Sequence, residues 1–387
     1  MSDFTYLTEE LDRLRADSLF RRCVCIDSMQ GPVVRMEDGS EKVLFCSNNY
    51  LNLAADGRII EAACQAARQY GTGAAAARLV SGTMRPHVEL EQGMARLLGK
   101  EAALYLPSGW AANQALLTTL PQKGDLVLMD RYDHASIIEA VRSGQAEFRT
   151  YRRDQLDRLE RYLAEDFYGR KFIVTESVFS MDGDVADLNA LVALKQRFGA
   201  ILIVDEAHAL GCMGDNGAGF CQQQGVADQV DIIVAPLGKA VAAAGGIVAG
   251  PQVVIDYLVN KARPFIFTTA PSPVAAAAAV KAIEIIQSEP ERRMRLCAGA
   301  GALRRQFLEM GLEIGQSTTH IIPVLLGSAE RAVEVSTLLL KAGFFVSAIR
   351  PPTVPPNTAR LRISVQSDHT LAQREGLCKA LGEILGR

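Results

Sequence analysis

The sequence has few aromatic residues and no long apolar run. Aromatic side chains make up 6% of its 387 residues, with a single tryptophan. No stretch reaches the roughly 18 consecutive apolar residues that suggest a membrane-spanning helix. The N-terminal stretch carries acidic side chains and lacks the apolar core of a signal peptide. We therefore expect a soluble, cytoplasmic protein without a membrane partner.

The sequence also lacks strong charge of either sign and any clustered cysteine motif. The formal net charge is −3, so there is no basic surface to favour nucleic acid as a partner. The eight cysteines are scattered, with no CxxC pair and no Cys/His cluster at zinc spacing. We expect reduced thiols and no metal site.

What is present is the alternation of an α/β protein. Hydrophobic residues make up 49% of the chain, enough for a large core divided into two or three domains. From about residue 100, short apolar runs alternate with helical segments, which predicts a mainly parallel sheet covered on both faces. After residue 275, an alanine-rich helix and further strand-like runs indicate a smaller α+β part. The predicted domains are an N-terminal helical segment and arm (1–45), a large α/β domain (46–275) and a C-terminal α+β domain (276–387).

One lysine stands alone in an apolar stretch. Lys239 is the only charged residue of 232–250. A desolvated ammonium group is costly unless it is paired, neutralised or covalently used. Lys239 could reach water along its own stem, pair with a distant carboxylate, or serve as a nucleophilic amine.

Other polar residues follow the predicted strands, where α/β proteins bind their ligands. A small-residue turn opens a helix after 102–106 and could hold an anion such as phosphate, or be an ordinary turn. The histidine after 125–130 could stack on a flat ligand, transfer protons or cap the next helix. These strand-end residues are Ser108, Gly109, Trp110, His134, Glu176, Ser180, Asp182, Asp205 and His208.

Together these residues fit pyridoxal 5'-phosphate. Lys239 would bind the cofactor covalently, Asp205 would pair with the pyridinium nitrogen, and His208 would hydrogen-bond the phenolic oxygen. The helix start at Ser108 would hold the phosphate. The alternative is a structural ion pair between Asp205 and Lys239. The combination of groups favours the cofactor.

Several longer motifs occur in order along the chain. They are "CSNNYLNLA" (46–54), "YGTG…RLVSGT" (70–83), "SGWAANQA" (108–115), "DRYDHASI" (130–137), "TESVFSMDGD" (175–184), "VDEAHALG" (204–211), "LGKA" (237–240) and "AIRPPTVPPNTARLRIS" (348–364). With them the chain resembles the α-oxoamine synthases, a branch of the fold-type I pyridoxal-phosphate enzymes. The resemblance implies a seven-stranded, mainly parallel central sheet. The last motif is most similar to the members that condense L-alanine with a pimeloyl thioester in biotin synthesis.

The resemblance also implies roles for individual residues. Lys239 would act as the base after binding the cofactor, and His134 would stack on its ring. Ser180 would join His208 at the phenolic oxygen, and Gly109 and Trp110 would contact phosphate and ring. The implied substrate-binding residues are Arg350 for the amino-acid carboxylate, Asn48 and Thr353 near the substrate, and Arg21, with Arg22 as an alternative, for the acyl group.

The resemblance further implies partners. Thr269 would reach the phosphate held by a neighbouring subunit, which makes the protein a homodimer with shared active sites. The expected substrates are L-alanine and an acyl thioester, carried by coenzyme A or by acyl-carrier protein. Alternatives are a sister synthase that uses glycine, serine or another acyl donor, an ordinary aminotransferase, and a cofactor-binding paralogue of weak or no activity.

Three segments depart from the family pattern. One is the run AVAAAGG (240–246) after the lysine, where more glycine and serine would be expected. Pro236 stands three residues before the lysine, where a phosphate-binding threonine or serine is usual, and it offers neither hydroxyl nor N–H. The run from Ala74 to Ala77 replaces a segment rich in glycine and serine, where close backbone approach is expected. We expect intact catalytic residues beside an altered phosphate site and acyl tunnel.

Overall fold

The structure is a computed structural model that describes residues 4–387 and forms two compact units. Unit 1 comprises residues up to Asn52, Met181–Asp184 and Met294–Arg387, and unit 2 comprises Leu53–Ser180 and Val185–Arg293. These boundaries differ from the domain limits expected from the sequence, because α11 (Pro273–Ser288) packs on helices of unit 2. The three-domain division stays a prediction.

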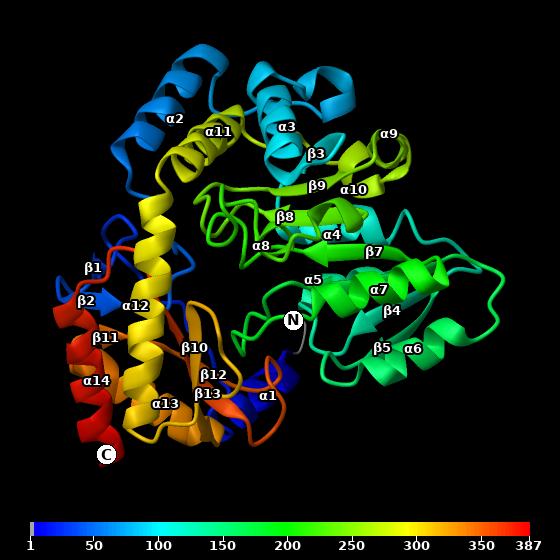
Figure 1. The fold of residues 1–387 in the computed structure, drawn as a ribbon. Helices are drawn as coiled ribbons and strands as arrows, with labels where there is room; N and C mark the ends of the chain where they lie inside the picture. Colours follow the sequence, from blue (N-terminus) through cyan, green and yellow to red (C-terminus); the bar gives the residue numbers. More distant parts are fainter. Residues whose placement is uncertain (1–3) are drawn as a thin grey trace. The chain divides into compact units, whose positions relative to one another are not determined.

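Unit 2 is built on a seven-stranded sheet of order β3-β9-β8-β7-β6-β4-β5 (Figure 1). Strand β9 is antiparallel to both of its neighbours, and the remaining pairs are parallel. The strands are β3 (Ala102–Leu106), β4 (Leu126–Asp130), β5 (Glu147–Tyr151), β6 (Lys171–Glu176), β7 (Ile201–Asp205), β8 (Ile232–Pro236) and β9 (Gly246–Gly250). The predicted mainly parallel sheet is confirmed.

Helices precede, connect and follow these strands along the chain. They are α2 (Gly57–Tyr70), η1 (Arg78–Gly82), α3 (Arg85–Leu98), α4 (Gly109–Leu117), α5 (Ala135–Ser143), α6 (Leu156–Ala164), α7 (Leu188–Phe198), α8 (Phe220–Gln223), η2 (Ala227–Gln229), α9 (Gln252–Lys261), α10 (Arg263–Ile266) and α11. Helix α12 (Pro290–Glu309) begins in unit 2 and continues into unit 1.

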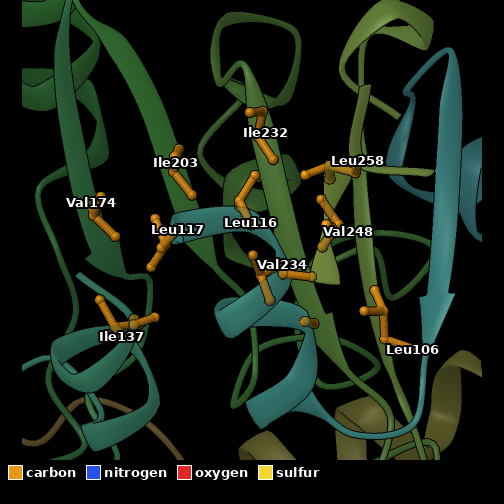
Figure 2. Close-up of a cluster of buried hydrophobic side chains, with 14 of the residues drawn as sticks. Leu106, Leu116, Leu117, Ile137, Val174, Ile203, Ile232, Val234, Val248 and Leu258 are labelled. Carbon is orange, nitrogen blue, oxygen red and sulfur yellow. The ribbon is translucent and has the colours of Figure 1, made fainter. Parts of the chain in front are cut away.

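The main apolar core of unit 2 shows which strand residues point to the same face of the sheet. Figure 2 shows Val174, Ile203 and Val234, from three adjacent strands, with Leu116 and Leu117 of α4 among them. Because side chains alternate along a strand, the residues two positions further on share this face. They are Glu176, Asp205 and Pro236, each the last residue of its strand. The apolar core therefore leads directly to a polar edge.

Unit 1 contains two three-stranded sheets, of order β1-β2-β11 and β10-β13-β12. Their strands are β1 (Val33–Arg35), β2 (Glu41–Leu44), β10 (Ile321–Gly327), β11 (Phe344–Phe345), β12 (Ser347–Ile349) and β13 (Ala359–Ser364). The helices are α1 (Thr5–Ala16), α13 (Ala329–Lys341) and α14 (Leu371–Leu385), together with most of α12. This is the smaller α+β part expected from the sequence.

Within residues 4–387, no helix combines the length and apolar character needed to span a membrane. The eight cysteines all lie in this part of the chain and none forms a disulfide there.

Candidate active site

The N-terminus of α4 offers an anion site at the end of β3. Ser108 caps the helix, since its Oγ accepts a hydrogen bond from the N–H of Ala111 at 3.0 Å. The other N–H groups of the first turn have no partner within the helix. Ser108 and Trp110 are exposed and Gly109 is half-buried, so a phosphate could reach these groups.

Two glycines allow the end of β8 and the start of β9 to approach this helix start. A Cβ added to Gly109 would lie 2.6 Å from Cγ of Pro236. One added to Gly246 would lie 2.5 Å from the carbonyl oxygen of Ser108. Pro236 therefore packs directly beside the predicted phosphate position, where it adds apolar surface and no donor.

The alanine run of the sequence lies beside the segment that contains Thr269. Ala77 forms an isolated antiparallel bridge with Thr269, and the carbonyl oxygen of Ala76 accepts a hydrogen bond from the N–H of Ala270 at 2.9 Å. Ala75 has a φ of +54°, a left-handed conformation that costs alanine more than glycine. Thr269 itself is exposed.

Asp205 is a buried carboxylate held in one orientation. It is 4% exposed at the end of β7. Its Oδ1 accepts the N–H of Ala207 and its Oδ2 accepts Nδ2 of Asn113, both at 2.9 Å. His208, three residues later, is also buried, and Ser180 is half-buried beyond the end of β6.

Lys239, His134 and Asp205 lie close enough to interact electrostatically. The pKa of His134 is lowered chiefly because the surrounding protein partly desolvates the ring, although the residue remains accessible to solvent. The positive charge of Lys239 lowers it further, and the carboxylate of Asp205 acts in the opposite direction. Lys239 is half-buried, and the Trp110 ring meets the His134 ring edge-on with centroids 6.4 Å apart. The lysine, the aspartate and the histidine singled out from the sequence are thus brought together.

Glu176 adds a second buried carboxyl group beside Asp205. The two residues are register partners on adjacent strands, and Glu176 is 2% exposed. Burial and the neighbouring charge of Asp205 raise the pKa of Glu176 to about 8, although Lys239 opposes this shift. Among the described residues, Glu176 Oε1 has no hydrogen-bond partner. Such an orphaned buried atom is what a site built to receive another group would contain.

Sequence reasoning missed two buried polar residues of this site. Asn113 is 2% exposed in the apolar stripe of α4, and Ser136 is 2% exposed in the first turn of α5. The signal for Asn113 was available, because it is the one polar side chain beside Ala112, Leu116 and Leu117 on that face. Glu176 was named among the strand-end residues but was assigned no role.

The four residues proposed to bind substrate all lie in unit 1. Nη2 of Arg21 donates to the carbonyl oxygen of Pro351 at 3.2 Å. The guanidinium of Arg350 donates to the carbonyl oxygens of Ser18 and Phe20 at 2.5 and 3.4 Å. The exposed Thr353 turns back on Arg350 through a backbone hydrogen bond of 3.1 Å. Arg350 is therefore already engaged by the N-terminal segment.

Asn48 belongs to a separate polar cluster of unit 1. Its Oδ1 accepts hydrogen bonds from the hydroxyl of Tyr50 at 2.9 Å and from Nη1 of Arg362 at 3.2 Å. Arg362 is 6% exposed on β13 and was not singled out from the sequence. With its Oδ1 fixed by two donors, Asn48 presents its amide N–H groups as donors.

A hollow of about 860 Å³ in unit 1 distinguishes the two N-terminal arginines. Arg22 lines this hollow, together with Arg350 and apolar residues such as Phe20, Leu44 and Phe345. Arg21 is not among the lining residues. The geometry therefore favours Arg22 over Arg21 as the residue that would contact a ligand bound in this hollow.

The groups gathered in unit 2 fit pyridoxal phosphate. They comprise an amine, a buried carboxylate for a ring nitrogen, an aromatic platform and a helix start for a phosphate. Within residues 4–387, no group of three or more His, Cys, Asp or Glu side chains is arranged to hold a metal ion.

Comparison with known proteins identifies the family to which the chain belongs. The chain belongs to the aminotransferase class I and II family, which matches residues 40–381, and within it to the α-oxoamine synthases. It is 42% identical over 382 residues to the 8-amino-7-oxononanoate synthase of Alkalilimnicola ehrlichii, with 98% of both chains covered. The enzyme of that name from Geobacter sulfurreducens is 43% identical, over 97% of this chain and 96% of the relative.

Solved structures agree with this assignment. A serine palmitoyltransferase from S. paucimobilis with a bound PLP–myriocin adduct superposes with a TM-score of 0.93 and 31% identity, over 99% of this chain and 98% of that chain. The 8-amino-7-oxononanoate synthase of Francisella tularensis has a TM-score of 0.78 and 29% identity, over 89% and 98% respectively. The resemblance noted in the sequence is confirmed.

Proposed function

We propose that this protein is a pyridoxal-phosphate-dependent synthase that condenses L-alanine with a pimeloyl thioester to give 8-amino-7-oxononanoate for biotin biosynthesis. The carrier of the acyl group is coenzyme A or acyl-carrier protein. The observation that carries the proposal is the convergence of Lys239, Asp205 and His134 beside the α4 N-terminus. It occurs in a chain 42% identical to such synthases over 98% of its length.

The reaction forms one carbon–carbon bond and breaks three bonds, the first of which is the Cα–H bond of alanine. The alanine α-carbon bonds to the acyl carbonyl carbon, and the carbon–sulfur bond breaks to release the thiol. The alanine carboxylate leaves as carbon dioxide, and a proton replaces it. The cofactor, when bound, supplies the electron sink that stabilises negative charge at the α-carbon.

The residues of unit 2 have distinct tasks in this proposal. Lys239 holds the cofactor and its amine takes the α-proton. The carboxylate of Asp205, oriented by Ala207 and Asn113, holds the proton at the ring nitrogen. His134 stacks on the ring. The phenolic oxygen is bound by His208 and Ser180, and the phosphate by the first turn of α4 with Gly109 and Trp110.

Substrate recognition is assigned to unit 1. From the sequence, the residues proposed to bind the amino acid are Arg350, Asn48 and Thr353, and Arg21 is proposed to bind the acyl group. The geometry adds Arg362, whose guanidinium donates to Oδ1 of Asn48 at 3.2 Å, to Oγ of Ser364 at 3.0 Å and to the hydroxyl of Tyr50 at 3.2 Å. Both arginines are thus engaged within unit 1, and we propose Arg362 beside Arg350 as a partner of the amino-acid carboxylate, since a guanidinium and an amide can bind a carboxylate together.

The proposed assembly is a cytoplasmic homodimer with shared active sites, in which Thr269 binds the phosphate held by the partner subunit. Its support is a set of large exposed side chains on unit 2 that lie near Thr269 or near its bridge partner Ala77 in sequence. Phe267 is 70% exposed, and Leu79 and Val80 of η1 are 53% and 81% exposed. Such apolar exposure is typical of an interaction surface.

A sister synthase is the second candidate, because serine palmitoyltransferases superpose with the higher TM-score of 0.93. The test pairs L-alanine, glycine or L-serine with pimeloyl-coenzyme A, pimeloyl-carrier protein or palmitoyl-coenzyme A in the presence of pyridoxal phosphate. Thiol release and the product mass are measured, with Lys239→Ala as the control. We expect release only with L-alanine and a pimeloyl thioester. Release with L-serine and palmitoyl-coenzyme A would establish the sister synthase. Conversion of the amino acid to its keto acid, with formation of pyridoxamine phosphate, would establish an aminotransferase.

A further inference from the structure

A continuous hydrogen-bond chain joins Asp205 to His134 through two buried residues. Nδ2 of Asn113 lies 2.9 Å from Oδ2 of Asp205 and 2.9 Å from Oγ of Ser136. Oγ of Ser136 lies 2.8 Å from Nδ1 of His134, which is also 3.2 Å from the N–H of Ser136. All four residues belong to unit 2.

The chemistry of the four groups sets the direction of each hydrogen. The carboxylate of Asp205 can only accept from the amide of Asn113, so the NH2 group, not the carbonyl, faces it. The second hydrogen of that NH2 group is donated to Oγ of Ser136. The hydroxyl hydrogen of Ser136 is then left for Nδ1 of His134.

This arrangement selects one tautomer of His134. Nδ1 faces two donors, the hydroxyl and the backbone N–H of Ser136. A hydrogen on Nδ1 would oppose that backbone N–H and lose its acceptor role. The ring hydrogen of neutral His134 is therefore on Nε2.

Desolvation and the positive charge of Lys239 favour the neutral form of His134, whereas the carboxylate of Asp205 opposes them. The ring faces Lys239 from the loop after β8 and Asp205 from β7, and on balance its pKa is lowered. Glu176 on β6 interacts with the backbone of His134 and has a raised pKa of its own. Asp133, the preceding residue, also has a raised pKa, first because it is buried and then because Asp130 and Glu176 are near. A cationic imidazole is not favoured here.

We propose that Asn113 and Ser136 are positioning residues that hold His134 as the neutral Nε2–H tautomer and tie its orientation to that of Asp205. The inference rests on the proposed roles of His134 and Asp205 in cofactor binding. A neutral imidazole can stack on a protonated pyridine ring without placing two cations in contact. The hydrogen-bond chain thereby links Asp205, the proposed partner of the ring nitrogen, to His134, which is proposed to stack on the ring face.

The test reads the tautomer directly in the full-length protein, with and without pyridoxal phosphate. The protein is labelled with 15N-histidine, and the His134 signals are assigned by their loss in His134→Asn. Nδ1 of His134 is expected to resonate as a bare nitrogen and Nε2 as a protonated one. In Ser136→Ala we expect a mixture of tautomers and a pKa of His134 nearer its ordinary value. We also expect a dissociation constant for the cofactor about tenfold higher, the size of one lost hydrogen bond.

Matched variants separate positioning from general damage. Ser136→Thr keeps the hydroxyl and should restore the tautomer. Ser143→Ala removes an exposed serine at the end of the same helix and should change nothing. Asn113→Ala should alter the His134 signals although Asn113 touches only Ser136 and Asp205 among these residues. Circular dichroism confirms that each variant is folded.

Two outcomes would overturn the inference. One is an Nδ1–H signal for His134 in the unaltered protein. The other is a Ser136→Ala variant that folds yet keeps both the tautomer and the affinity for pyridoxal phosphate. These readouts concern the protein and its cofactor alone. A protein that shows the tautomer but makes no product would contradict the proposed function and leave this inference standing.

Discussion

The ring of Pro236 packs on the backbone of Gly109, so that a Cβ at Gly109 would lie 2.6 Å from Cγ and 2.7 Å from Cβ of the proline. Pro236 is the last residue of β8 and Gly109 is the first residue of α4. The contact therefore joins the strand that leads to Lys239 with the helix start proposed to bind the phosphate. The family resemblance leads us to expect a threonine or serine at this position, with a hydroxyl that donates a hydrogen bond. Pro236 has no such group and contributes only apolar packing.

Replacing this proline should strengthen cofactor binding. Pro236→Thr restores a hydroxyl beside the helix start, and a hydrogen bond to a charged group contributes about 1.5–3 kcal/mol. We expect the dissociation constant of pyridoxal phosphate to fall by about tenfold or more, measured by fluorescence titration. Pro290→Thr, at the exposed first residue of α12, is the control. Equal affinity in the parent and Pro236→Thr would show that the proline does not weaken the site.

The same contact predicts a coupled pair of substitutions. Gly109→Ala places a methyl group against Pro236, and overpacking of this kind typically costs about 1–3 kcal/mol. The thermal midpoint of the cofactor-free protein should fall accordingly. Pro236→Ala removes the opposing ring, so the double variant should recover most of the loss. If Gly109→Ala were equally destabilising in both backgrounds, the two residues would not be in contact as described.

Much of this architecture could be predicted from the sequence because its strongest signals are local. The continuous apolar runs that became β6, β7 and β8 are typical of buried parallel strands, and Asp205 at the end of β7 marked the ligand edge. Strand β5 was missed because it is a sheet-edge strand whose sequence, EFRTY, carries two charges and is mostly accessible.

Contacts between distant residues were the part that the sequence could not supply. Asn113 and Asp205 are 92 positions apart, and only the packing of α4 on the sheet brings them together. The engagement of Arg350 by Ser18 and Phe20 likewise depends on how the N-terminal segment folds back within unit 1. Local patterns named the residue types of the site, but their partners depend on tertiary structure.

Stability should depend on pH through Glu176. Its pKa in the folded protein is raised to about 8 from an ordinary 4.5, so the folded state keeps a proton that the unfolded state loses. The stabilisation is complete below pH 4.5 and is lost as the pH rises through 8, by at most about 1.4 kcal/mol per pH unit. Glu176→Gln cannot ionise, so its thermal midpoint should fall less than that of the parent between pH 5 and about 9.

The exposed Glu139 of α5 offers the matched comparison for this pH effect. Glu139→Gln should follow the parent protein at every pH. Because Asp133 also has a raised pKa, some pH dependence should remain in Glu176→Gln. Parallel curves for the parent and Glu176→Gln would contradict the assignment of a retained proton to Glu176.

Two arginine variants test which guanidinium binds the amino-acid carboxylate. The thermal midpoint is measured for both, because both arginines are hydrogen-bonded within unit 1. Loss of a charge-assisted contact of about 1.5–3 kcal/mol predicts that Arg362→Ala raises the KM for L-alanine by roughly 10- to 150-fold. Arg350→Ala should chiefly lower the thermal midpoint, because its hydrogen bonds to Ser18 and Phe20 are lost. A large rise in KM with Arg350→Ala alone would show that Arg350 binds the carboxylate of L-alanine, as the sequence first suggested.

Shared active sites predict that two inactive variants can rescue each other. Lys239→Ala removes the base from its own site, whereas Thr269→Arg places a bulky cation in the site of the partner subunit. A hybrid dimer then contains one site with both defects and one intact site. Random exchange of subunits should leave about a quarter of all active sites intact, since half of the dimers are hybrid and each of these has one intact site of two. Sedimentation measures the dimer and thiol release measures the activity. Should both variants remain dimeric while the mixture stays inactive, Thr269 would act within its own subunit.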